Sequence, residues 1–140
     1  MDFFNLQKAT IRSYSVGYGP RPNDDEEVEQ RLTISRSGRV WFSSYAYNEV
    51  RLSHKQVWVG QERATELLRL IGLYFASCVE ICLATDIGTW EMRLWDTAGE
   101  SAKFEGSLCC AFEVEGRDLS TLIREGIGMS GLFLYDGDNE

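Results

Sequence analysis

Four carboxylates in the middle of the chain are the residues best suited to catalytic chemistry. Asp86, Glu91, Asp96 and Glu100 flank one predicted β-hairpin. Two carboxylates held on either side of a substrate can act as general acid and general base. A small hydrolase-like enzyme that uses carboxylates of the segment Asp86–Glu100 is therefore one hypothesis for the function. Acidic residues beside turns are also common in proteins without activity, and the sequence does not show which two would face a substrate.

Nucleophilic catalysis and metal binding have little support in the sequence. A serine or cysteine nucleophile needs a neighbouring base, and the chain has one histidine, His54. His54 lies in the polar stretch Arg51–Gln56, which is predicted to be a surface loop. The cysteines are Cys78, Cys82, Cys109 and Cys110. They form neither a C-x-x-C pair nor two clusters at zinc-ligand spacing, so we expect reduced thiols and no metal site.

The segment Leu94-Trp-Asp-Thr-Ala-Gly-Glu100 resembles the switch II segment of small Ras-like GTPases. Nucleotide binding of that type needs a Gly-rich phosphate loop that ends in a Lys and a Ser or Thr. The sequence contains neither this loop nor the Asn-Lys-x-Asp motif of the family. We therefore predict that Asp96–Gly99 is the turn of a β-hairpin without affinity for nucleotides.

Composition and charge exclude several classes of function. The chain has 140 residues, 44% of them hydrophobic, which is sufficient for one domain with its own core. A net charge of −8 argues against direct contact with nucleic-acid phosphates, because such contacts need clustered Lys and Arg. The sequence has neither a membrane-spanning apolar run nor the basic, apolar start of a secretory signal. A cytoplasmic location without membrane contact is therefore expected, and the oligomeric state is left open.

The predicted fold is a single α+β domain, residues 1–140, with an antiparallel sheet of about five to seven strands. Alternating apolar residues predict strands at 9–16, 28–36, 39–47, 81–85, 89–95, 102–108 and 132–135, while residues 110–114 either extend a strand or add one. Helical spacing predicts a long helix at 61–79, packed on one sheet face, and a short helix at 118–127, near one end. Asp118 or Ser120 would cap the short helix. Residues 17–27, which contain both prolines and an acidic block, are predicted to form a mobile acidic loop.

The predicted strand 39–47 carries apolar side chains on both of its faces. Val40 and Phe42 would point to one face, and Trp41, Tyr45 and Tyr47 to the other. Either both faces are covered in the fold, or the aromatic face is a binding surface on which Trp and Tyr act as anchors.

Four segments together resemble a set of small, uncharacterised bacterial proteins, mainly from Firmicutes. The segments are Asp86-Ile-Gly-Thr-Trp-Glu91, Phe104-Glu-Gly-Ser-Leu108, Asp118-Leu-Ser-Thr-Leu-Ile-Arg124 and Leu132-Phe-Leu-Tyr-Asp-Gly137. The similarity runs over residues 28–138 and implies a compact α+β domain without an assigned activity. The strand 32–38, a helix, a later hairpin and a closing helix also resemble the layout of emfourin-type protease inhibitors, although the second Gly that they favour after Gly38 is missing. That resemblance implies an inhibitor.

The favoured interpretation is a non-enzymatic protein that binds another protein through an acidic and aromatic surface, without cofactor or metal. An immunity protein, a toxin antagonist or a phage-type inhibitor of a nucleic-acid-handling enzyme would fit, because such targets are basic and attract an acidic binder. The acidic block would otherwise be a solvated loop. The residues expected to contact the partner are Asp24, Asp25, Glu26, Glu27, Trp41, Tyr45 and Tyr47.

Overall fold

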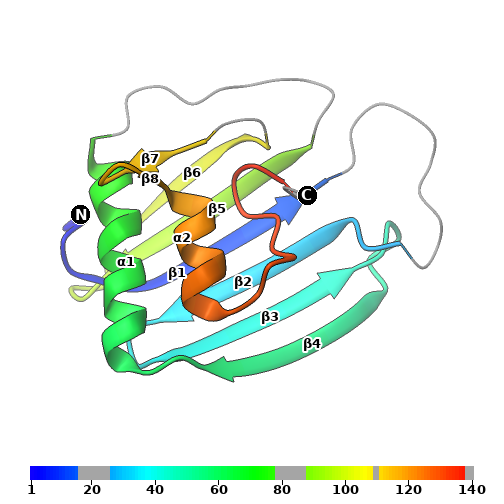
Figure 1. Cartoon of the computed structure of the whole chain (residues 1–140), viewed down its shortest axis with the longest axis horizontal. Helices are drawn as coiled ribbons and strands as arrows, with labels where there is room; N and C mark the ends of the chain where they lie inside the picture. Colours follow the sequence, from blue (N-terminus) through cyan, green and yellow to red (C-terminus); the bar gives the residue numbers. More distant parts are fainter. Residues whose placement is uncertain (16–25, 78–87, 109–110, 138–140) are drawn as a thin grey trace.

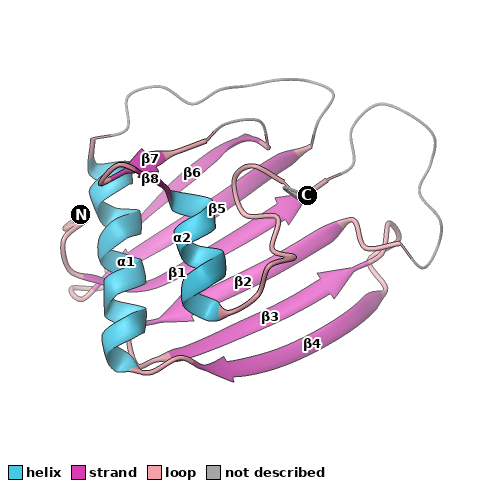
Figure 2. Cartoon of the chain, viewed as in Figure 1, coloured by secondary structure: helices cyan, strands magenta, loops and turns pink. Residues whose placement is uncertain are grey.

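The computed structural model of the chain describes residues 1–15, 26–77, 88–108 and 111–137. Within these residues the fold is α+β, as predicted: a six-stranded antiparallel sheet, a two-stranded sheet and two helices (Figures 1 and 2). The large sheet has the strand order β4-β3-β2-β1-β5-β6. Its strands are β1 (Leu6–Tyr14), β2 (Glu29–Ser35), β3 (Arg39–Tyr45), β4 (Arg51–Trp58), β5 (Thr89–Asp96) and β6 (Ser101–Ser107). The remaining elements are α1 (Gln61–Ala76), the short strands β7 (Glu113–Val114) and β8 (Arg117–Asp118), and α2 (Leu119–Ile127).

Both helices lie on the same face of the large sheet (Figure 1). Every second residue of the central strands points to this face and is buried, as Ile11, Leu32 and Met92 illustrate. These side chains pack against the apolar stripe of α1, which includes Leu68 and Ile71. The strands therefore alternate between a core side and an outer side, the pattern of an antiparallel sheet that is covered on one face. α2 lies beside α1 over the sheet, and not near one end as expected.

The ends of the helices follow from local sequence. Gly60, with a φ of 90°, precedes α1, and the described part of the helix ends at Ala76. Asp118 is the N-cap of α2, where its carboxylate accepts a hydrogen bond of 3.0 Å from the backbone N–H of Thr121. Gly128 ends α2 in the left-handed conformation that glycine favours. Of the two predicted caps, Asp118 is thus the one that is used.

Two predicted hairpins are confirmed. In the first, Ile34 pairs with Val40 across a turn at Gly38, which has a φ of 107°. In the second, Gly99 donates a backbone hydrogen bond of 3.1 Å to the carbonyl of Asp96, and the flanking strands β5 and β6 pair in register from Trp95 and Ser101. The switch II-like segment therefore forms a hairpin turn.

Residues 51–56, predicted to be a surface loop, belong to the edge strand β4, so that prediction is wrong. Seven of the eight residues of β4 are solvent-exposed, and the eighth, Val57, is partly buried. An edge strand that buries neither face shows no alternation of apolar and polar residues, which is the signal that identifies strands in a sequence. His54 remains exposed, but on a strand.

The predicted last strand at 132–135 is also wrong. The segment is buried but forms turns, and Leu134 has a φ of 47°. Side chains replace a neighbouring strand as its hydrogen-bond partners. Gln30 accepts from the Phe133 N–H at 2.7 Å, and Ser13 donates to the Leu134 carbonyl at 2.8 Å. Apolar composition predicted the burial of this segment but not its conformation.

Several predictions fall outside the described residues. These are the strand at 81–85, the state of all four cysteines, and the greater part of the acidic loop at 17–27.

Among the helices that the structure describes, none has both the length and the apolar composition that crossing a membrane requires.

Candidate functional site

The sheet face opposite the helices, which we call the open face, is covered by neither α1 nor α2 (Figure 2). The strand register arranges its side chains in four rungs across the sheet. The first rung holds Trp58, Arg39, Ser35, Lys8, Trp95 and Ser101, and the second holds Gln56, Trp41, Thr33, Thr10, Arg93 and Lys103. The third holds His54, Ser43, Arg31, Arg12, Glu91 and Glu105, and the fourth holds Arg51, Tyr45, Glu29, Tyr14, Thr89 and Ser107.

Charge is distributed unevenly over the open face, although the whole chain is acidic. The first two rungs contain four cations and no carboxylate, and all three carboxylates of the rungs lie in the third and fourth. Aromatic rings on this face are partly covered by cations of the chain itself. Lys8 Nζ lies 4.1 Å from the centre of the Trp95 ring, and the guanidinium of Arg31 lies 4.2 Å from that of Tyr45.

Glu29 is the most deeply buried charge on the open face. Its side chain is 3% exposed and lies between Arg12 Nε at 2.9 Å and Arg31 Nε at 2.5 Å. The hydrogen bond to Glu29 raises the pKa of Arg31 above its usual value. The two guanidinium groups offset the cost of removing this carboxylate from water.

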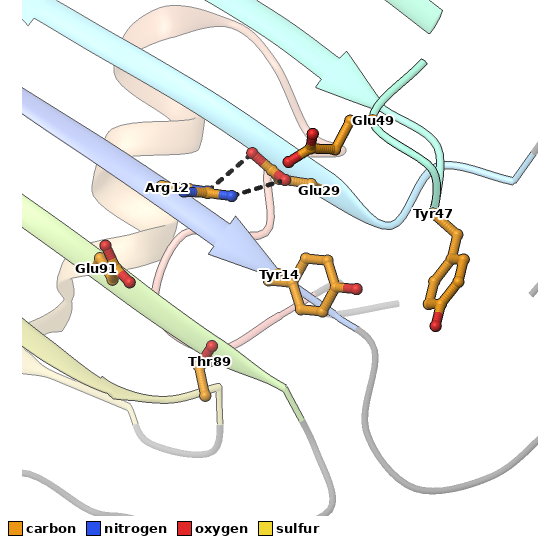
Figure 3. A pocket seen from close by; sticks show the side chains of 7 residues that line it. All are labelled: Arg12, Tyr14, Glu29, Tyr47, Glu49, Thr89 and Glu91. Atoms are coloured by element: carbon orange, nitrogen blue, oxygen red, sulfur yellow. Dashed lines mark hydrogen bonds and ion pairs between the residues drawn. The ribbon is translucent and has the colours of Figure 1, made fainter. Parts of the chain in front are cut away.

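A pocket of about 300 Å³ opens beside Glu29, at the end of the face where β1 ends and β5 begins (Figure 3). Its lining residues are Arg12, Tyr14, Glu29, Tyr47, Glu49, Thr89 and Glu91. The lining thus presents three carboxylates against one guanidinium, together with three hydroxyl groups. Burial raises the pKa of Tyr14 above its usual value, with smaller contributions from Tyr47 and Glu29, so the phenol stays neutral.

Turn geometry positions the residues that lie beyond the strands. The turn after β3 is closed by a hydrogen bond of 2.8 Å from the Ala46 N–H to the Val50 carbonyl, and it carries Tyr47 and Glu49 to the edge of the pocket. Glu49 adopts a φ of 66°, which a non-glycine residue rarely adopts. Before β5, Gly88 lies so close to the Tyr14 carbonyl that a Cβ at this position would be 2.3 Å from its oxygen.

The chemistry of the pocket suits a cationic group. Arg12 binds Glu29, and Glu91 lies 4.0 Å from Lys103 in a half-exposed pair that contributes little. The carboxylates of Glu49 and Glu91 can therefore accept hydrogen bonds from an entering ammonium or guanidinium, and tyrosine rings attract cations. Among the described residues, no group of three His, Cys, Asp or Glu side chains could hold a metal ion.

The structure places the predicted contact residues in different surroundings. Trp41 and Tyr45 lie on the open face, and Tyr47 lines the pocket and is 42% exposed. Glu26 is exposed, whereas the Glu27 carboxylate accepts a hydrogen bond of 3.0 Å from the amide of Gln30, a residue on the helix side of β2. Asp24 and Asp25 lie outside the described residues.

The carboxylates of the alternative, enzymatic hypothesis lie at separate places in the described part of the chain. Asp96 accepts hydrogen bonds from the backbone N–H groups of Asp2, Ala98 and Glu100 at 2.9, 3.0 and 2.9 Å. These hydrogen bonds lower the pKa of Asp96, and the bond from Asp2 contributes most. They also hold the Asp96 carboxylate within its own turn and against the N-terminal residues. Glu100 pairs with the N-terminal ammonium at 2.7 Å, and Glu91 lies in the pocket. Asp86 lies outside the described residues.

Sequence reasoning missed five lining residues, Arg12, Tyr14, Glu29, Glu49 and Thr89. The alternation of β1 would have assigned Arg12 and Tyr14 to the outer face, and that of β2 would have added Glu29. Glu49 lies in a turn, and its spacing from the strands carries no comparable signal.

No protein-family model matches the chain, and no curated protein matches it either. The resemblances to uncharacterised bacterial proteins and to emfourin-type inhibitors therefore stay predictions.

Proposed function

We propose that the chain is a non-enzymatic binding module that holds another protein on its open face and takes a Lys or Arg side chain of that protein into the pocket. The observation that carries this proposal is the pocket itself, in which two carboxylates and two tyrosines lie beside Glu29, a third carboxylate that Arg12 and Arg31 already bind. A basic partner, such as the target of an immunity protein or of an inhibitor of a nucleic-acid-handling enzyme, supplies such side chains. The cytoplasm is the proposed location.

Two groups of residues outside the pocket support this role. Trp41 and Tyr45 offer aromatic area on the same face, and large aromatic side chains contribute much of the energy of protein interfaces. The net charge of −8, together with the acidic block Asp24–Glu27, would attract a basic protein and speed encounter. In this scheme the pocket and the aromatic residues determine the dissociation rate, while the acidic block determines the association rate.

The test is calorimetric titration of the protein with an oligo-arginine peptide. The variant Tyr47→Ala/Glu49→Gln removes one ring and one charge from the turn that borders the pocket. Losing a charge-assisted hydrogen bond and a cation–π contact costs about 2 kcal/mol, so the dissociation constant should rise by roughly thirtyfold.

The matched control is Glu113→Gln, which also removes one negative charge but does so at an exposed carboxylate outside the pocket. The affinity of this control for the peptide should change by less than about threefold, because salt screens the attraction between the bound peptide and a distant exposed charge. Equal weakening in both variants would show non-specific attraction to an acidic protein and would refute the proposed pocket.

A further inference from the structure

Two adjacent rungs of the open face bring like charges together on β5 and β6. Glu91 lies directly opposite Glu105, and Arg93 lies directly opposite Lys103. Like charges in directly opposed positions of an antiparallel pair destabilise the sheet. Exchanging Glu105 and Lys103 would give two opposite-charge pairs with the same composition. The ion pair that these four residues do form is diagonal, Lys103 to Glu91, at 4.0 Å between half-exposed side chains.

The acidic pair and the basic pair are complementary to each other. Such complementarity fits a two-fold axis that is parallel to the plane of the sheet, perpendicular to its strands, and midway between the second and third rungs. Rotation about this axis generates a second molecule whose open face lies against the first, with each strand over the same strand of the other copy. The second rung of one molecule then faces the third rung of the other, and the first faces the fourth. Two sheets that pack face to face keep their strands within about 30° of each other, so this arrangement is an ordinary sheet packing.

This operation brings opposite charges together on β5 and β6. Arg93 comes to lie over Glu91 of the second copy and Lys103 over Glu105 of the second copy, and the symmetry repeats both pairs. No charged side chain in the four rungs comes to face a charge of its own sign.

Cations also meet aromatic rings in the same arrangement. Arg39 faces Tyr45 of the second copy, and Lys8 faces Tyr14 of the second copy beside Glu29. The cation that enters the pocket region is then Lys8 of the other molecule.

We infer that the open face is a self-complementary dimer interface and that its occupant is a second copy of this chain. The inference rests on the proposed function, since it names the molecule that supplies the cation to the pocket. A two-fold interface uses the same patch on both subunits. Such a patch can pair charges across the interface only if it carries both positive and negative side chains, at positions that the axis exchanges. A basic partner protein and a second copy would then exclude each other.

The size of the face predicts a weak dimer. Six strands spaced about 4.8 Å apart and seven residues of about 3.3 Å rise give a footprint of roughly 500 Å² on each copy. The total of roughly 1,000 Å² is at the lower limit of specific interfaces. We therefore expect a dissociation constant in the micromolar range and a dimer that dissociates as salt is added, because charge pairs at its margin are screened.

The experiment uses two charge-reversal variants and analytical ultracentrifugation. R93E/K103E makes the patch on β5 and β6 wholly acidic, and E91K/E105K makes it wholly basic. Each variant alone should be monomeric, with self-association weakened at least tenfold. Mixed in equal amounts, they should form a heterodimer at least as tight as the wild-type homodimer, because every charged side chain that these four positions contribute on β5 and β6 then faces an opposite charge. Thermal melts confirm that each variant is folded, and the neutral variant R93Q/K103Q replaces R93E/K103E if that protein does not fold.

A wild-type protein that stays monomeric at all concentrations would overturn the inference, as would variants that dimerise alone or fail to associate when mixed. The oligo-arginine titration separates this inference from the proposed function. Peptide binding that depends on Tyr47 and Glu49 in a monomeric wild type would refute the dimer and leave the pocket standing. A dimer that passes the charge-reversal test, with peptide affinity unchanged by Tyr47→Ala/Glu49→Gln, would refute the pocket and leave the dimer standing.

Discussion

Replacing Arg124 by Ala should destabilise the fold more than any other loss of a single ion pair described above. Arg124 projects from α2, and its side chain is 9% exposed. It donates to the carbonyls of Leu132 at 2.8 Å and Gly137 at 2.6 Å, and it pairs with the carboxylate of Asp136 at 2.5 Å. These bonds hold the C-terminal segment on the helix side of the sheet, together with the Ser13 hydroxyl, which donates to the Leu134 carbonyl.

The magnitude follows from what the substitution leaves behind. Asp136 is 15% exposed and would lose its cation, and the buried carbonyls would lose their donor. Removing one partner of a buried pair costs about 3–5 kcal/mol. A domain of this size has a free energy of unfolding of about 5–15 kcal/mol, so the variant should lose a large part of it and melt roughly 10 °C lower.

The assay is urea denaturation followed by circular dichroism, with Arg117→Ala as the control. Arg117 also belongs to an arginine–carboxylate pair, at 2.8 Å from Glu125, but the two side chains are 56% and 59% exposed. An exposed pair contributes at most about 1 kcal/mol. If the losses in unfolding free energy caused by Arg124→Ala and by Arg117→Ala differ by less than about 1 kcal/mol, burial does not determine the strength of the Arg124 contact, and the prediction is refuted.

Two further predictions concern Asp96 and Gly72, which lie against the N-terminal residues Asp2 and Phe3. Because hydrogen bonds lower the pKa of Asp96 in the fold, its carboxylate stabilises the protein above the ordinary carboxyl pKa of about 4, and this stability is lost as the pH falls. Asp96→Asn should therefore flatten the acid side of a plot of unfolding free energy against pH; a curve that stays parallel to the wild type would contradict this. Gly72→Ala should cost about 1–3 kcal/mol, because the new Cβ would lie 1.9 Å from the Phe3 carbonyl oxygen, whereas Gly131→Ala, which meets nothing within 4 Å, should be close to neutral in the same melt.

The sequence predicted the central strands and helices because their side chains divide cleanly between two environments. In β5, Trp90, Met92 and Leu94 face the helices while Glu91 and Arg93 face outward, and this alternation is visible in the chain itself. The same residues predict an antiparallel sheet with one covered face. The order of the strands in the sheet depends on contacts between distant segments, and the local sequence pattern does not indicate that order.

The errors arose where local pattern and tertiary environment disagree. β4 is an edge strand whose exposed side chains show no period, and the segment 132–135 is apolar but is held by side chains such as Gln30. The candidate site was found only in part for a related reason. Tyr47 was identified by its aromatic character, but the pocket also needs Glu29 and Glu49, which come together through pairing across the sheet and a turn with an unusual φ.

The most direct test of the proposed cation-binding pocket is to locate the bound oligo-arginine peptide from changes in the amide chemical shifts of the protein. The titration is done at a protein concentration at which the protein is monomeric. The shifts should concentrate at Tyr14, Tyr47, Glu49 and Thr89, around the pocket of the open face. Shifts that spread evenly over exposed carboxylates, or that concentrate on the helix side of the sheet, would contradict the proposed pocket.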